Sequence, residues 1–322
     1  MPWAAQPISR RALLRGVAGL AGLAALTLAG CSTDDAPPPQ VLTATDQYPD
    51  TGLLASVAWL AERIDDPNLR LLDCSPLDSY RDGHLPGASH VWWQDTIEVN
   101  NNTYGMLTGA PMRAEIVRES GITPDSTVVC YDDRGGQYAA RIAWMLHVQS
   151  FATVRLLDGG RQAWHAAGHD LTSDSVAPPP GAIEPVQNES IIAHGNDIAT
   201  RLNDPAYVII DTRTAAERAE TWFDRLRTGT IPGSHHLPRT DFLTQDGYAL
   251  LPPADLRARL TAAGVREAAP EIIVFGLHGT LACLPYVAIR AIGYPSVRVY
   301  DGSWAEWGAN KDWPVEPLPG AS

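Results

Sequence analysis

Short apolar runs alternate with segments of helical periodicity along most of the chain. The runs at 69–72 and 127–131 are typical of strands buried on both faces of a sheet. Three segments have apolar residues at helical spacing: Tyr138, Ile142, Met145 and Leu146; Leu256, Leu260 and Ala263; and Leu281, Leu284, Ala288, Ile289 and Ile292. Strands that alternate with helices predict parallel β-sheets with helices on both faces, and therefore an α/β fold.

The pattern occurs twice. The matched segments are 71–73 with 209–211, 83–88 with 229–234, 128–131 with 272–275, and 157–160 with 300–303. The offset of roughly 140 residues is the size of a domain rather than of a solenoid repeat. Between the copies, the Pro-rich stretch at 176–181 indicates a stiff linker. We therefore expect two domains of one architecture, at 51–175 and 190–322, joined by a linker at 176–189.

The first thirty residues have the pattern of an export signal. Arg10 and Arg11 precede an apolar run at 16–30, which is too short to span a bilayer. The paired arginines resemble those of a twin-arginine export signal. The run ends in Leu-Ala-Gly-Cys, which resembles a bacterial lipobox with Cys31 as the lipidated residue. We expect a signal peptide at 1–30, a tether at 31–50 and a protein lipid-anchored to the bacterial cell envelope, periplasmic or on the outer surface. The alternative is a chance Arg pair before an uncleaved membrane anchor.

Composition and charge narrow the classes of function. The 322 residues carry a net charge of −13, and Lys311 is the one lysine. Removing 1–30 removes three arginines and no acid, which leaves −16. Such an acidic chain is a poor candidate for nucleic-acid binding. Four cysteines are too few for a disulfide-built scaffold, so we expect Cys74, Cys130 and Cys283 to be free, buried thiols.

The strand–loop–helix segment of the second copy is the candidate site for chemistry. The strand at 272–275 continues into Gly276, Leu277, His278, Gly279, Thr280, Leu281 and Ala282, and then into a helix. A Gly-containing loop at this place directs backbone N–H groups into a small cradle, and the helix N-terminus adds partial positive charge. Such a cradle binds an anion. With a cysteine at its first position, it would stabilise a thiolate or persulfide.

Several motifs resemble those of the tandem-domain rhodaneses, the thiosulfate and 3-mercaptopyruvate sulfurtransferases. These motifs are the segment at 299–308, the Asp-x-Arg at Asp211 to Arg213 and the Gly-x-Ile-Pro-Gly at 229–233. The first copy resembles the non-catalytic N-terminal domain of that family. The resemblance implies two rhodanese-like domains, a small sulfur-containing or other anion as substrate, and no cofactor or metal.

The chain departs from the family at the residues that carry the chemistry. The family places its persulfide-forming cysteine where this chain has Gly276, and commonly an arginine where it has Leu281. The first copy has Asp132 at the matching position, as is usual for the inactive domain. Three hypotheses follow: a degenerate member that binds an anion, a working sulfurtransferase that uses Cys283, and a non-catalytic lipoprotein that binds a protein partner. We also expect that a cysteine introduced at 276 would find a preformed cradle.

Single candidates each have a plainer interpretation. Cys283 is a displaced nucleophile or, as we favour, a buried helix residue. His278 either donates to a bound anion or points to solvent, and both interpretations stay open. Arg213 either binds an anion or, as we favour, pairs with Asp211. The pair at 235–236 is a poor metal site, because adjacent strand residues diverge and no third ligand is suitably spaced.

Overall fold

The computed structural model describes residues 43–318, except 152, 183–185, 203, 220–225 and 267–268. The proposed signal peptide and Cys31 lie outside the described residues. Within the described part, no helix combines the length and the apolar character needed to cross a membrane.

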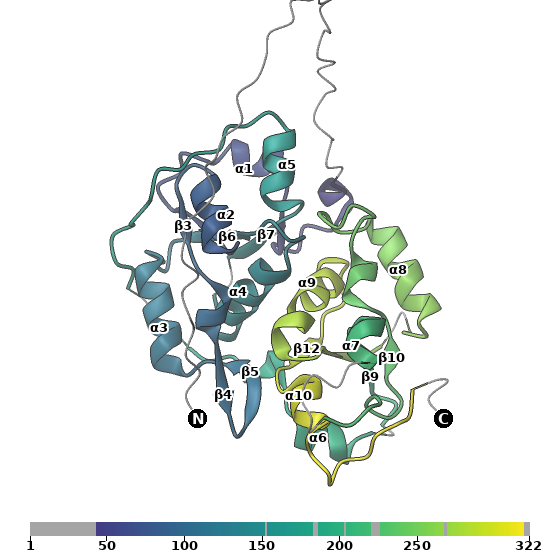
Figure 1. Cartoon of the computed structure of the whole chain (residues 1–322). Helices are drawn as coiled ribbons and strands as arrows, with labels where there is room; N and C mark the ends of the chain where they lie inside the picture. The colour runs from purple at the N-terminus through teal and green to yellow at the C-terminus, as the bar shows by residue number, and fades with distance from the viewer. Residues whose placement is uncertain are drawn as a thin grey trace, which may run out of the picture. The chain divides into compact units, whose positions relative to one another are not determined.

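The first domain contains a parallel sheet of five strands in the order β1-β7-β6-β2-β3 (Figure 1). Its elements are β1 (Leu54–Ala55), α1 (Val57–Ala61), β2 (Leu69–Asp73), α2 (Leu77–Asp82), β3 (Ala88–His90), β4 (Ile97–Asn100), β5 (Thr103–Leu107), α3 (Ala110–Glu119), β6 (Thr127–Tyr131), α4 (Gln137–Val148), β7 (Val154–Leu157) and α5 (Gly160–Ala166). Strands β4 and β5 form a separate antiparallel pair.

The second domain repeats this topology with the order β10-β9-β11-β12-β8, also all parallel. Its elements are β8 (Ile192–Ala193), α6 (Gly195–Thr200), β9 (Tyr207–Asp211), α7 (Ala215–Ala219), β10 (His235–His236), α8 (Pro253–Ala262), β11 (Glu271–Phe275), the 3-10 turn η5 (Gly279–Ala282), α9 (Cys283–Ala291), β12 (Val297–Tyr300) and α10 (Ser303–Trp307). Matching the strands pairwise reproduces the first sheet, so the predicted α/β fold of two like domains is confirmed.

The local predictions coincide with these elements except near the candidate loop. The buried run at 127–131 is β6, and the run at 69–72 is β2, which extends to Asp73. The helix expected from Leu281 onward instead begins with the 3-10 turn η5, and α9 proper starts at Cys283. The polypeptide therefore winds more tightly after β11 than helical periodicity alone indicates.

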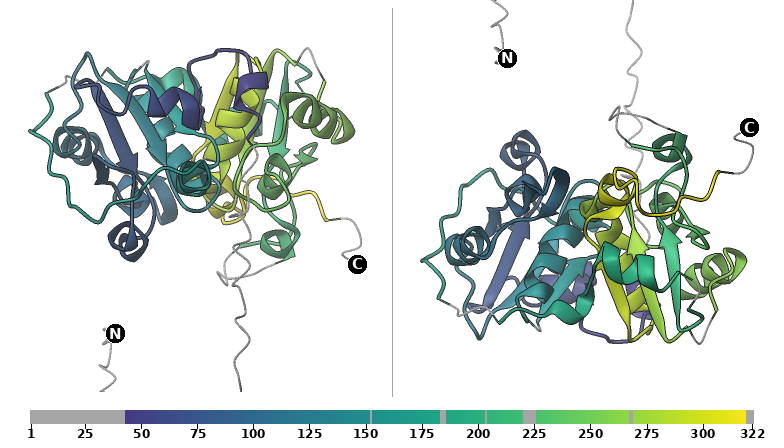
Figure 2. Two further views of the ribbon diagram at one scale, coloured as in Figure 1. Left: turned by 90° about the horizontal axis from the view of Figure 1, so that it is seen from above. Right: turned by 90° about the horizontal axis from the view of Figure 1, so that it is seen from below.

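The two domains share one hydrophobic core. The largest cluster of buried hydrophobic residues includes Val128 and Trp144 of the first domain together with Ile272 and Ile289 of the second. Helix α4 packs directly against α9. Both views of Figure 2 show these two helices, coloured teal and yellow-green, side by side between the sheets. The loops at the carboxyl ends of β6 and β11 therefore lead into the helices of the interface between domains.

Candidate functional site

The 276–282 loop follows β11, which lies between β9 and β12 in its sheet. Ser303 at the start of α10 anchors the loop: its Oγ accepts the N–H of Gly276 at 3.1 Å and donates to the Tyr300 carbonyl at 2.7 Å. The Gly276 carbonyl in turn accepts the N–H of Trp304 at 3.0 Å. The first loop residue is thus held on both sides at the carboxyl end of the sheet, where ligand sites of parallel sheets lie.

The matching loop of the first domain shows what such a cradle can hold. The carboxylate of Asp132 is fully buried and accepts four backbone N–H groups at 2.7–3.0 Å, from Arg134, Gly136, Tyr138 and Ala139. Burial raises the pKa of Asp132, although these four donors act in the opposite direction. The first-domain cradle is therefore already filled by a carboxylate of the chain itself.

The second-domain loop has no such side chain and is tighter. A Cβ added at Gly276 would lie 2.9 Å from the Cβ of Leu281 and 3.1 Å from the carbonyl oxygen of His278. The expectation of a cradle preformed for a cysteine is therefore wrong, because η5 brings Leu281 over the first position. The Cys283 N–H is bonded to the Thr280 carbonyl, so one of the four donor positions used around Asp132 is occupied.

Four other polar groups of this loop have no hydrogen-bond partner among the described residues. Within the described part of the chain, the backbone N–H groups of His278 and Thr280 meet no hydrogen-bond acceptor. Two buried side-chain atoms also have no hydrogen-bond partner among the described residues: the hydroxyl of Thr280 and Nδ1 of His278. Thr280 is fully buried. Unpaired buried polar groups are uncommon and costly, at about 1–3 kcal/mol each. The loop thus presents unused donors in a confined space.

His278 does not point to solvent. Its ring stacks on Trp93 at 6.1 Å between centroids with planes 6° apart, and meets Tyr104 edge-on at 5.6 Å. Both aromatic residues belong to the first domain. Burial, together with the positive charges of Arg141 and Arg239, lowers the pKa of His278 to about 4. The imidazole is therefore neutral at pH 7 and offers an anion at most an N–H, not a charge.

Cys283 is fully buried at the start of α9, and its Sγ donates to the Gly279 carbonyl at 3.3 Å. Burial raises the pKa of this thiol to about 12, although the Arg141 guanidinium beside it acts in the opposite direction. The thiolate needed for attack on sulfur is therefore scarce at neutral pH. Cys74 and Cys130 are also buried and free.

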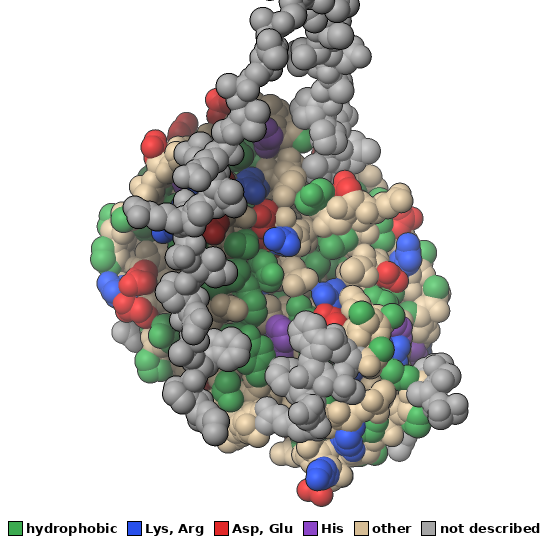
Figure 3. Space-filling view, viewed as in Figure 1, with side chains coloured by type: hydrophobic (Ala, Val, Ile, Leu, Met, Phe, Trp, Pro, Cys, Tyr) green, Lys and Arg blue, Asp and Glu red, His purple; other side chains and the backbone are tan. Residues whose placement is uncertain are grey.

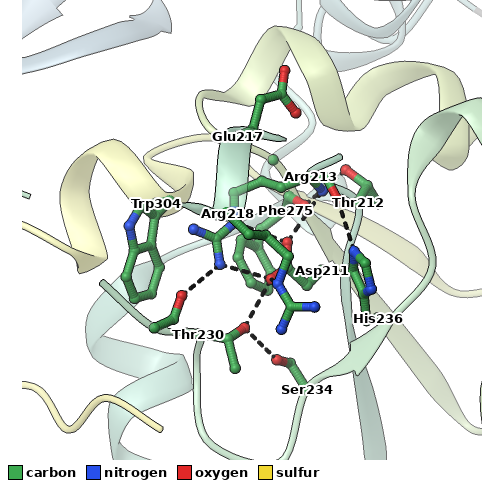
Figure 4. A network of polar contacts seen from close by, with 12 residues as sticks. Asp211, Thr212, Arg213, Glu217, Arg218, Thr230, Ser234, His236, Phe275 and Trp304 are labelled. Atoms are coloured by element: carbon green, nitrogen blue, oxygen red, sulfur yellow. Dashed lines mark hydrogen bonds and ion pairs between the residues drawn. The ribbon is translucent and has the colours of Figure 1, made fainter. Parts of the chain in front are cut away.

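Asp211 and Arg213 lie side by side at the carboxyl end of β9 (Figure 4). Both side chains are fully buried, and Arg213 binds the Asp211 carboxylate through Nε at 2.9 Å and Nη2 at 2.7 Å. Arg218 approaches the same carboxylate at 3.2 Å, and the Thr230 hydroxyl donates to it at 2.9 Å. This arrangement matches the interpretation favoured from the sequence, in which Arg213 pairs with Asp211 and does not bind an anion. Glu217, by contrast, points away from the cluster in Figure 4.

Two interdomain contacts near the loop were not indicated by the sequence. Arg141 of α4 is fully buried and forms an ion pair at 2.7 Å with Asp301, which follows β12. Arg239 binds Glu217 through two N–H groups and donates to Gln137 at the start of α4 at 3.1 Å. The Arg141–Asp301 and Arg239–Gln137 contacts each join residues more than a hundred positions apart, so no local signal could have predicted them.

The remaining candidates lie apart from the loop. His236 contacts the Arg213 carbonyl through Nε2 at 2.9 Å, and His235 faces Gly264, so the two rings diverge. Among the described residues, no three His, Cys, Asp or Glu side chains gather as metal ligands. On the face shown in Figure 3, acidic and basic side chains are scattered around a central region of hydrophobic side chains.

Two like parallel sheets, each with a strand–loop–helix segment at its carboxyl end, define a tandem-domain α/β protein. The Rhodanese-like domain family matches the chain twice, at residues 56–167 and 195–310. The chain therefore belongs to the rhodanese family.

Known relatives span nearly the same length. Thiosulfate sulfurtransferase of Mus musculus is 33% identical over 272 residues, covering 79% of this chain and 91% of the relative. 3-Mercaptopyruvate sulfurtransferase of Escherichia coli O157:H7 is 32% identical over 273 residues, covering 81% and 96%. The crystal structure of SseA, a 3-mercaptopyruvate sulfotransferase from Escherichia coli, superposes with a TM-score of 0.69 at 28% identity, covering 78% of this chain and 98% of that one.

Proposed function

We propose that this rhodanese is a degenerate family member, exported and lipid-anchored, whose 276–282 loop binds a small sulfur-containing or other anion without transferring sulfur. The absence of a side chain at Gly276 carries the proposal. Sulfur transfer needs an atom that attacks a sulfane sulfur and then carries it, and glycine offers none.

The contrast between the two cradles supports anion binding. Asp132 fills the first cradle with its own carboxylate, held by four N–H donors. The second cradle keeps the N–H groups of His278 and Thr280 and the Thr280 hydroxyl unpaired within the described chain. An external oxyanion that accepts from these groups would satisfy them as Asp132 satisfies its neighbours.

A working sulfurtransferase is the second candidate, because the Arg141 guanidinium lies beside the Cys283 thiol and favours its thiolate. In that reaction the thiolate attacks the sulfane sulfur of thiosulfate, the S–S bond breaks and sulfite leaves. Cyanide or a thiol then removes the sulfur from the persulfide and regenerates the thiolate. Burial of Cys283 opposes this candidate, since donor and acceptor must both reach Sγ.

The deciding experiment measures turnover and binding on the same preparations. Wild type should convert thiosulfate and cyanide to thiocyanate at no more than the rate of Cys283→Ser, yet bind thiosulfate in calorimetry. Thr280→Val, which keeps the side-chain shape and removes the hydroxyl, should weaken this binding several-fold. Turnover that Cys283→Ser abolishes would establish the second candidate, and turnover that survives it would refute both.

A chain with neither turnover nor thiosulfate binding would instead favour a surface lipoprotein that recognises a protein partner.

The proposed lipid anchor and export signal are tested separately. Labelling with a fatty-acid analogue in a bacterial host should mark wild type and not Cys31→Ser, and equal labelling of both would contradict lipidation. Replacing Arg10 and Arg11 by lysine should block export, because lysine keeps the charge but loses the guanidinium geometry.

A further inference from the structure

A polar cavity of about 540 Å³ lies between the two domains, away from the 276–282 loop. Its lining includes His147 and Ser150 at the end of α4, and Arg290 near the end of α9. Arg290 is seven residues along α9 from Cys283, or roughly 10 Å along a helix axis. The cavity therefore lies toward the opposite end of the interdomain helices from the family's chemistry, and its volume is typical of a small-molecule site.

The charge of the cavity is the opposite of the charge of the protein. None of the residues that line it is Asp or Glu, although the chain carries a net charge of −13. Arg290 forms no ion pair with any described carboxylate, whereas most buried or half-buried guanidinium groups of a protein find one. Nη1 of Arg290 donates to the Tyr286 hydroxyl at 2.6 Å. The guanidinium carries five N–H groups in all, so donors remain.

The groups nearest Arg290 are uncharged: its guanidinium lies over the Tyr286 ring at 5.4 Å from the centroid. The Tyr286 hydroxyl, which accepts from Arg290, lies 3.5 Å from Nδ1 of His147. Burial and the charge of Arg290 lower the pKa of His147 to about 4, so this imidazole is neutral at pH 7. Small polar side chains, those of Thr51, Ser150, Asn188, Ser190 and Ser296, complete the polar part of the lining. They offer hydroxyl and amide donors to the remaining oxygens of a ligand.

We propose that this interdomain cavity is a binding site for a small organic anion, whose carboxylate or phosphate group pairs with Arg290. The first domain supplies His147 and Ser150, and the second supplies Arg290 and Ser296, so a bound anion contacts both domains at once. The site is separate from the loop proposed above and does not depend on it.

Calorimetric titration of the whole chain with succinate, and separately with inorganic phosphate, tests the proposal at an ionic strength held constant with NaCl. At least one probe should bind saturably, and Arg290→Gln should weaken it at least tenfold. Arg81→Gln is the matched control, because it makes the same charge change at an exposed side chain outside the cavity. Thr280→Val should leave unchanged the component of binding that Arg290→Gln weakens, which separates the cavity from the loop.

Ser190→Trp provides an independent variant if Arg290→Gln does not fold. Ser190 is exposed at the cavity wall, so the indole should fill the space without disturbing the core, and it should also abolish binding. Lack of saturable binding of either probe to wild type would overturn the proposal. Binding that Arg290→Gln and Ser190→Trp leave intact, or that Thr280→Val removes, would overturn it as well.

Discussion

Arg141→Met should lower the free energy of unfolding far more than a substitution at a surface ion pair, because it removes a contact between the two domains. The Arg141 side chain is fully buried and that of Asp301 is 5% exposed, and their charges meet at 2.7 Å. Methionine fills much of the same volume but leaves the Asp301 carboxylate buried, with the Leu107 N–H as the hydrogen-bond donor that remains to it. Removing one member of a buried ion pair costs about 3–5 kcal/mol, so this is the loss we expect in the free energy of unfolding.

A second substitution distinguishes the cost of leaving the Asp301 charge unpaired from the cost of the packing lost at position 141. Asp301→Asn in the Arg141→Met chain removes the buried charge and keeps an oxygen for the Leu107 N–H. The double variant should therefore be more stable than Arg141→Met alone, and the coupling energy of the cycle should be about 1–3 kcal/mol. Arg81→Met is the control, since its exposed pair with Asp78 spans 3.9 Å and should matter by less than about 0.5 kcal/mol.

Urea unfolding followed by tryptophan fluorescence gives these free energies by linear extrapolation. The slope with urea also reports whether the two domains still unfold together. An Arg141→Met cost under about 1 kcal/mol would refute the reasoning, as would single effects that add to within about 0.5 kcal/mol.

Further predictions concern reactivity, pH, packing and the linker. With a pKa of about 12, the Cys283 thiol should react with iodoacetamide at pH 8 orders of magnitude more slowly than free cysteine, and peptide mapping after minutes of exposure should find it unmodified. Between pH 6.5 and about 4, the unfolded chain binds a proton at His147 that the folded chain does not. Stability should therefore fall as pH falls, by up to ~3 kcal/mol, and His147→Gln should show a shallower loss in urea midpoints. Gly276→Cys should lower the stability by about 1–3 kcal/mol because its Cβ crowds Leu281, and an unchanged thermal midpoint would contradict the tight loop. Limited proteolysis should cut first in the tether and next in the linker 176–181, where Ala177, Pro179 and Pro180 are exposed, and an early cut inside 127–160 would show that the domain boundaries are misplaced.

The fold could be predicted because its signals are local and occur twice. A buried strand such as β6 and the amphipathic stretch of α4 each depend on neighbouring residues, and the second copy confirms the interpretation of the first. The contents of the candidate site depend on distant partners. The environment of His278 is made by Trp93 and Tyr104 of the other domain, and no periodicity indicates that stacking.

The tightness of the loop could not be predicted from the sequence either, because η5 depends on how Leu281 packs against Gly276. One signal could have been used further. A carboxylate at the first position of the first loop, Asp132, suggests that the chain supplies its own anion there, and four N–H donors do hold it. Reasoning from one loop to its repeat would have identified the second loop as the one that lacks a carboxylate of its own.

The core shared by α4 and α9 means that neither repeat is an independent building block. A half produced alone would expose to water the face of α4 or α9 that its sister now covers, and would tend to aggregate. A chain severed in the linker should, for the same reason, remain assembled as two fragments. A protein built from a single repeat of this kind would need either a second copy of itself or a more polar surface on this helix, because each repeat supplies part of the other's interior.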